Sequence, residues 1–136
     1  MLKRDSLTAQ MQQLSHTLAK VKRLIVEEQH DEALSTLEAV LGEYFGTSIT
    51  DLLETPANVF RQQLDKTGFM PEELSLLADF LDTAAGTRGQ DADRDRIWEK
   101  VLLIYDVLEQ EHKVVSFAHI ARRAAITGAG GGHIKF

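Results

Sequence analysis

The sequence predicts an all-α fold, built from antiparallel helical hairpins that stack into a compact right-handed array of about six or seven helices. Three observations support this prediction. Apolar residues recur at alternating intervals of three and four, as on one face of a helix. No segment alternates apolar and polar residues long enough to make a strand. Proline and glycine fall mainly between the periodic segments, where they end or begin helices.

The first predicted unit is a helical hairpin over residues 5–45. Its first helix begins near Asp5 or Ser6, either of which can cap it. The apolar face of this helix comprises Leu7, Met11, Leu14, Leu18, Val21 and Ile25. The break near Gln29–His30 is so short that the second helix, 33–45, must lie antiparallel beside the first.

Two glycines lie near the end of this hairpin, one just past its second helix and one inside that helix. Gly46 suits the left-handed position just past a helix end. Gly42 lies within the helix, at a cost of about 1 kcal/mol relative to alanine. Close approach of another helix would explain a glycine at that position.

The middle of the chain predicts two further helices after a short turn. Thr50 can cap a turn over 51–54, and Thr55-Pro56 provides an N-cap and a first helical residue for 57–66. Gly68 ends that helix. Pro71 begins the next one, where carboxylates in the first turn face the positive end of the helix dipole.

The last part of the chain predicts a second hairpin over Asp91–Ile126. A loop at Gly86–Gln90 precedes a long helix capped by Asp91 or Asp93, whose broad apolar face indicates a central position. Ser116 is a suitable cap for the final helix, 117–126. We therefore expect a single helical domain over 1–126 and a flexible glycine-rich tail over 127–136.

Composition excludes several classes of protein. With no cysteine among the 136 residues, disulfides and thiolate metal sites are excluded. A net charge of −6 argues against nucleic-acid binding, and no apolar run is long enough to span a membrane. Met1–Asp5 is charged and no apolar segment follows, so we expect no signal peptide and a cytoplasmic location.

Acidic residues outnumber basic ones over residues 47–90, whereas residues 91–136 are balanced. The acidic excess is consistent with a surface for a basic partner. An ordinary solvated surface is the interpretation that we favour.

Two stretches resemble tetratricopeptide repeats, which are helical hairpins of roughly 34 residues. Trp98-x2-Val101-Leu102-x2-Tyr105 is similar to the first half of that motif. His30–Leu34 resembles the start of a repeat's second helix, with Ala33 at the small position.

The layout of the chain from residue 1 to about 126 also resembles a family of small bacterial proteins of unknown function, described as tetratricopeptide-like. The similarity lies in the charged start and in three short stretches, namely Leu18–Lys20, Asp31–Leu34 and Glu43–Gly46. The resemblance implies an α-helical, cytoplasmic protein and transfers no catalytic residue.

The sharpest chemical pattern is a pair of Glu-x-x-His segments, Glu27–His30 and Glu109–His112. Di-iron helical bundles use this spacing because it places both ligands on one helix face. Here both segments lie at helix ends, and no apolar-flanked glutamate on another helix completes the set. We therefore assign no metal ligands, and keep a metal-binding helical bundle as the alternative function.

Other chemistry-bearing residues have ordinary interpretations. His112 and His119 could face each other across the turn at 113–116 as a pH-sensitive pair, although two separate histidines are the favoured interpretation. Arg122-Arg123 could bind an acidic partner, and we favour a solvated pair.

Trp98 and Tyr105 share a helix face, and we interpret them as core residues rather than an exposed binding site. No nucleophile motif and no phosphate-binding loop occurs in the sequence. The sequence thus predicts a non-enzymatic protein–protein interaction or scaffold module, with no catalytic, cofactor-binding or metal residues. Its partner is an unidentified protein or peptide, and a homodimer is a further possibility; we expect no nucleic-acid or membrane partner.

Overall fold

The computed structural model describes residues 3–88 and 92–129. Over these ranges the chain contains only helices and connecting turns, which confirms the predicted all-α class. The elements are α1 (Lys3–Val26), α2 (His30–Val40), the π-helical turn η1 (Leu41–Phe45), α3 (Ile49–Glu54), α4 (Ala57–Thr67), α5 (Pro71–Gly86), α6 (Ala92–Glu111) and α7 (Phe117–Ala129).

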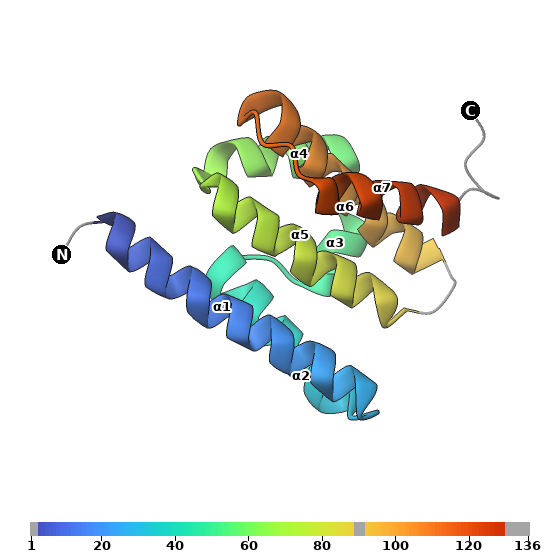
Figure 1. Ribbon diagram of the computed structural model, residues 1–136. Helices are drawn as coiled ribbons and strands as arrows, with labels where there is room; N and C mark the ends of the chain where they lie inside the picture. The colour runs from blue at the N-terminus through green and yellow to red at the C-terminus, as the bar shows by residue number, and fades with distance from the viewer. Residues whose placement is uncertain (1–2, 89–91, 130–136) are drawn as a thin grey trace.

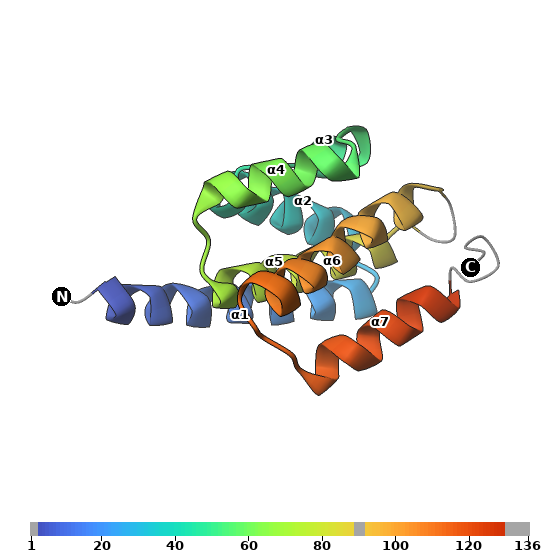
Figure 2. The same cartoon turned by 90° about the horizontal axis from the view of Figure 1, so that it is seen from above.

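The helices α5 and α6 pack against each other more extensively than any other pair. The α1–α2 hairpin covers one side of α5, and α3 and α4 pack on α6. Figure 1 shows α1 running alongside α5, and Figure 2 shows α3 and α4 on the side of α6 opposite to α7. No described helix is both long and apolar enough to cross a membrane.

The core lies around α5 and α6. Seven residues of α5 are buried, namely Leu74, Leu77, Ala78, Phe80, Leu81, Ala84 and Ala85. The helix α6 contacts α3, α4, α5 and α7, which confirms the central position that its broad apolar face predicted.

Local chemistry sets most helix ends where the sequence predicted them. Gly46 and Gly68 each follow a helix with a φ of 69°, the left-handed conformation that glycine adopts without strain. Pro71 is the first residue of α5. The backbone N–H of His119 donates to Ser116 Oγ at 3.0 Å, so Ser116 caps α7.

Two predicted caps were wrong by one or two positions. Ser48, not Thr50, caps α3, because the backbone N–H of Asp51 donates to Ser48 Oγ at 3.0 Å. Pro56 occupies the N-cap of α4 rather than its first helical position, which leaves Thr55 outside the helix as the last residue of the preceding turn.

Close approach of another helix, which would have explained a glycine at position 42, does not occur there. A Cβ atom added there would meet only the Thr47 carbonyl oxygen, at 3.9 Å, which is an ordinary contact. Gly42 instead lies in η1, where the backbone widens before Gly46 donates its N–H to the carbonyl of Leu41.

The C-terminal hairpin differs from the prediction. The helix α6 packs far more closely on α5 than on α7, because α7 contributes few apolar side chains to the core. The last helix runs to Ala129, three residues past the predicted end at Ile126. Asp91, one of the two predicted caps of α6, and the tail at 130–136 lie outside the described residues.

Candidate functional site

A groove runs along α5 between the N-terminal part of α1 and the segment that joins α6 to α7. Its largest hollow has a volume of about 630 Å³ and is lined by Met11, Pro71, Glu72, Ser75, Leu76, Asp79 and Val114. These residues come from three separate parts of the chain, so only the folded protein forms this surface. We call it the α1–α5 groove.

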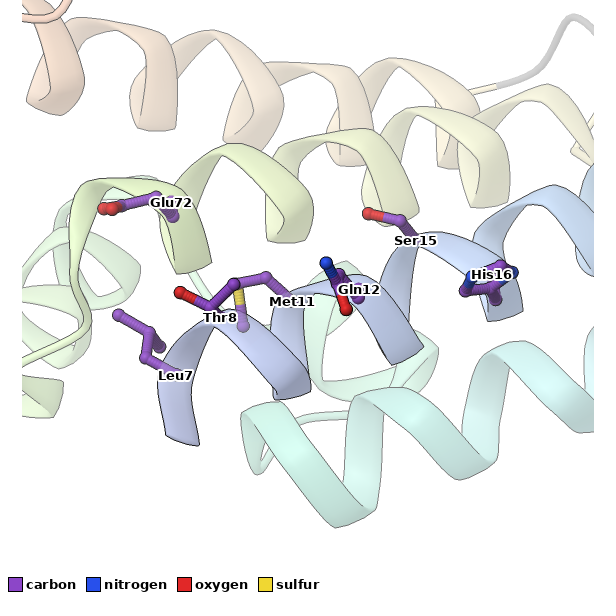
Figure 3. Close-up of a pocket in the computed structure, with 7 residues that line it drawn as sticks. All are labelled: Leu7, Thr8, Met11, Gln12, Ser15, His16 and Glu72. Carbon is purple, nitrogen blue, oxygen red and sulfur yellow. The ribbon is translucent and has the colours of Figure 1, made fainter. Parts of the chain in front are cut away.

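Two neighbouring hollows share Glu72 and extend the groove along α1. One is lined by Leu7, Thr8, Met11, Gln12, Ser15, His16 and Glu72. Figure 3 shows the α1 side chains along one stretch of the helix, with Glu72 across from them on α5. The other includes Ser6, Gln10, Gly68 and Met70, so the groove reaches the turn that precedes α5.

The spacing of residues on α5 explains the floor of the groove. Glu72, Ser75, Leu76 and Asp79 follow the i, i+3, i+4, i+7 pattern, which places them on one face of the helix. The opposite face of α5 is buried in the core. The floor is therefore a face of α5 whose residues stay half-buried or exposed.

The wall formed by α1 continues the apolar face predicted from the sequence. Leu14 and Leu18 on this face are buried, whereas Leu7 and Met11 are only half-buried. In Figure 1 the N-terminal part of α1 projects past the rest of the α1–α2 hairpin. The groove thus offers apolar surface that the fold itself does not bury.

The charges that line the groove are acidic. Glu72, Glu73 and Asp79 line the three hollows, and none of the described lining residues is a lysine or arginine. Glu73 already has partners, because its carboxylate accepts hydrogen bonds from the Tyr44 hydroxyl at 2.7 Å and from the Met70 backbone N–H at 2.8 Å. Burial and this carboxylate raise the pKa of Tyr44.

Asp79, like Glu73, is a half-buried carboxylate of the groove. Burial raises its pKa, and the neighbouring charge of Asp82 raises it further, while Lys22 and His119 lower it in part. Within the described ranges, no hydrogen bond or ion pair reaches its carboxylate. Asp79 therefore lies partly out of water without a cation in direct contact.

A second polar cluster holds α7 against α5 and α6. The Asp82 carboxylate accepts hydrogen bonds from Trp98 Nε1 at 3.0 Å and from Arg122 Nη2 at 2.8 Å. The Arg94 guanidinium lies 4.3 Å from the centre of the Trp98 ring. We call Asp82, Trp98 and Arg122 the Asp82 clasp; its three side chains come from three different helices.

His119 lies beside this clasp. Its ring stacks on Tyr105, with centroids 4.6 Å apart and planes 20° apart, and its Nε2 lies 3.3 Å from Ser75 Oγ. Burial, with the charges of Asp82 and Asp79, raises the pKa of Tyr105 to about 12. No described carboxylate orients His119 from its other nitrogen, so the Ser75–His119 pair lacks the third member of a catalytic triad.

The two Glu-x-x-His segments do not converge. Glu27 and His30 are exposed at the α1–α2 turn, and Glu109 and His112 are exposed at the end of α6. Figure 1 places the α1–α2 turn and the α6–α7 turn on opposite sides of the molecule. The described residues contain no group of three or more histidine, aspartate or glutamate side chains suited to a metal ion.

Two further pairs of residues were considered in the sequence, namely the aromatic residues Trp98 and Tyr105 and the histidines His112 and His119. Trp98 and Tyr105 are 8% and 3% exposed, which confirms the prediction that they belong to the core. His112 is exposed, whereas His119 is half-buried against Tyr105, so the two have separate environments.

The arginine pair in the middle of α7 was predicted to be solvated; its side chains are 42% and 36% exposed, and both also form ion pairs within the protein. Arg122 binds Asp82, and Arg123 Nη2 lies 2.9 Å from Asp106 and 3.8 Å from Glu109. Both guanidinium groups therefore face the body of the protein. The partner of Arg122 lies 40 residues earlier in the chain, where only tertiary structure could reveal it.

Comparison with known protein families, curated proteins and solved structures finds no match to this chain.

Proposed function

We propose that this protein is a non-enzymatic interaction module that binds a segment of another protein in the α1–α5 groove. The observation that carries the proposal is the groove itself, in which Met11, Leu76 and Val114 leave apolar surface half-buried beside unpaired carboxylates. Apolar grooves between helices commonly accept an amphipathic helix from a partner.

The shape of the groove favours a protein segment over a small molecule. The hollows follow α1 and α5 and are shallow, whereas small-molecule sites are enclosed and have a few convergent polar groups. The floor residues Glu72 and Asp79 are seven positions apart, which spans about 10 Å along α5. A partner helix of two or three turns matches this length.

We further propose that the fold is tetratricopeptide-like and that the protein acts in the cytoplasm. The α1–α2 hairpin supports the tetratricopeptide-like fold, since Ala33 is buried at the position where the repeat requires a small residue. The burial of Trp98 and Tyr105, the two aromatic positions of the repeat motif, supports it as well.

We also propose self-association through the outer face of α7. Phe117 is 90% exposed and Ile120 is 53% exposed. The other exposed residues on this face are small and uncharged, namely Ala121, Ala124, Ala125 and Gly128. A face of this kind is complementary to itself, because small side chains let two copies of one helix approach closely and no charge opposes its counterpart.

Light scattering over a range of concentrations tests self-association. We expect a dimer mass that shifts toward the monomer in Phe117→Ser, because the largest exposed apolar side chain is removed. The matched control is Val26→Ser, which removes an exposed apolar residue from the end of α1. A monomer at all concentrations would exclude the α7 interface without affecting the groove.

Site-specific crosslinking tests the groove. A photoreactive residue at Met11 should link to a partner segment in extracts of the native cell, whereas the same residue at Gln62, exposed on α4, should not. The linked protein is then purified and titrated against the labelled chain by NMR. We expect shifts on α1 and α5 and loss of binding in Leu76→Asp; identical adducts at both positions would contradict the proposal.

A further inference from the structure

We propose that the α1–α5 groove selects a cationic partner, namely an amphipathic helical segment whose lysine or arginine binds the carboxylate of Asp79. This inference rests on the proposed function and adds the chemistry of the partner. Glu72, an exposed residue that lines the same hollow, provides the second negative charge.

The charge of the lining supports a cation. The three hollows that form the groove are lined by three carboxylates, and their described lining residues include no lysine or arginine. Glu73 is occupied by Tyr44 and by the Met70 backbone. Glu72 and Asp79 therefore carry the negative charge that remains available for a partner.

The surroundings of Asp79 show why a cation would bind there rather than elsewhere on the surface. The groups near Asp79 are Lys22 on α1, Asp82 on α5, Tyr105 on α6 and His119 on α7. The charge of Asp82 is already neutralised by Arg122. His119 is engaged with Ser75 and Tyr105. No ion pair within 4 Å forms between Asp79 and a described cation.

A carboxylate that is partly removed from water gains more from a direct cation than an exposed carboxylate does. Binding of a lysine or arginine would replace the water that Asp79 has lost with a charge-assisted hydrogen bond. Asp79 thus offers a site where the free protein bears a cost that the complex relieves.

The apolar residues around Asp79 fit the stem of such a side chain. Met11 on α1, Leu76 on α5 and Val114 before α7 line the same hollow as the carboxylate. Lysine and arginine bury their methylene groups against apolar surface while the charged end reaches a polar group. The partner segment is therefore amphipathic, with leucine-like residues beside its cation.

Designed peptides test the inference. Three fluorescent peptides share the same leucine and alanine positions, and carry only lysine, only glutamine or only glutamate at the polar positions. We expect the lysine peptide to bind most tightly by fluorescence anisotropy. Its affinity for Asp79→Asn should fall about tenfold, as is usual for loss of one charge-assisted hydrogen bond.

The control variant is Glu54→Gln, which removes the same charge from an exposed residue on α3, on the far side of the molecule in Figure 2. Its affinity for the lysine peptide should equal that of the wild type, and Glu72→Gln should give an intermediate loss. NMR shifts of Met11 and Leu76 on titration with the lysine peptide should place it in the groove.

Several results would overturn the inference. Equal loss of affinity in Asp79→Asn and Glu54→Gln would show a non-specific charge effect. Absence of binding by the lysine peptide would also exclude a cationic partner in the groove. Equal binding of the lysine and glutamine peptides, with shifts in the groove, would reject the cationic partner and leave the proposed function standing.

Discussion

Asp82 connects three helices through one carboxylate. Trp98 and Arg122 both donate to it, and the Trp98 ring is 8% exposed beneath the arginines around it. A carboxylate that satisfies a buried indole N–H and a guanidinium at the same time contributes more than an exposed ion pair, because its loss leaves a buried donor without a partner.

We therefore predict that Asp82→Ala lowers the free energy of unfolding by about 2 kcal/mol. The control is Asp106→Ala, which removes a partner of Arg123 that is more exposed than Asp82 and should cost less than about 1 kcal/mol. Urea denaturation of the two variants provides the measurement. Equal costs would show that the Asp82 clasp contributes no more than a surface pair.

The ionisation of Asp79 should destabilise the folded protein, whereas the Asp82 carboxylate stabilises it. Its pKa is raised mainly by burial, so the folded protein binds this proton more tightly than the unfolded chain does. The free energy of unfolding should therefore decrease as the pH rises from the ordinary value of 3.8 through the raised pKa.

Asp79→Asn should remove this pH-dependent loss and make the protein more stable than the wild type at neutral pH. The difference should shrink in acid, where Asp79 is protonated in both states. Chemical denaturation across this pH range measures the effect. A variant profile parallel to that of the wild type would contradict the assignment of the penalty to Asp79.

At the scale of elements, the α2–η1 junction contains two glycines in different situations. Gly46 has a φ of 69° and would be strained as any other residue, whereas Gly42 has room for a Cβ atom. We predict that Gly42→Ala stabilises the protein by about 0.5–1 kcal/mol and that Gly46→Ala destabilises it by about 1–2 kcal/mol.

Thermal unfolding of the two alanine variants tests this pair, because both change the same residue type within one short segment. If Gly42→Ala also destabilises the protein, then the π-helical turn needs the extra freedom of glycine. That result would identify η1 as a mobile junction rather than a fixed end of α2.

The helices could be predicted from the sequence because their signals are local. Leu7 to Ile25 is a periodic face, and Gly46, Gly68, Pro71 and Ser116 act within one turn of their own position. The π-helical turn was not predicted, since it depends on a small change of backbone geometry that residue type does not specify.

The candidate site was beyond sequence reasoning for a different reason. The groove joins Met11, Leu76 and Val114, which are far apart in the chain, and the sequence gives no rule for their meeting. The acidic excess over residues 47–90 was visible, and it includes Glu72 and Asp79. Which of these carboxylates would be half-buried depended on how α1 and α7 flank α5.

At the scale of the whole molecule, stability is distributed unevenly. The helix α5 buries seven residues, whereas Ile126 is the only buried apolar residue of α7 among its described side chains. The helix α7 is held mainly by Asp82, Asp106 and the Tyr105–His119 stack. Polar contacts at a partly exposed surface resist local opening less than a buried core does.

We predict that the amide protons of α7 exchange with solvent faster than those of α5 and α6. Hydrogen exchange followed by NMR measures this residue by residue. Asp82→Ala should accelerate exchange in α7 selectively, while the amides of α5 keep most of their protection. Uniform protection across all three helices would show that α7 unfolds only with the whole domain.

Trp98 is the only tryptophan of the chain, and it lies where α7 meets the core. Its fluorescence is therefore a built-in optical signal for this one contact. While α7 is packed against α5 and α6, the indole is shielded and is held by Asp82. Its emission should therefore be blue-shifted and insensitive to quenching by iodide. Release of α7 would expose the ring, and the emission would move to longer wavelength without any added label.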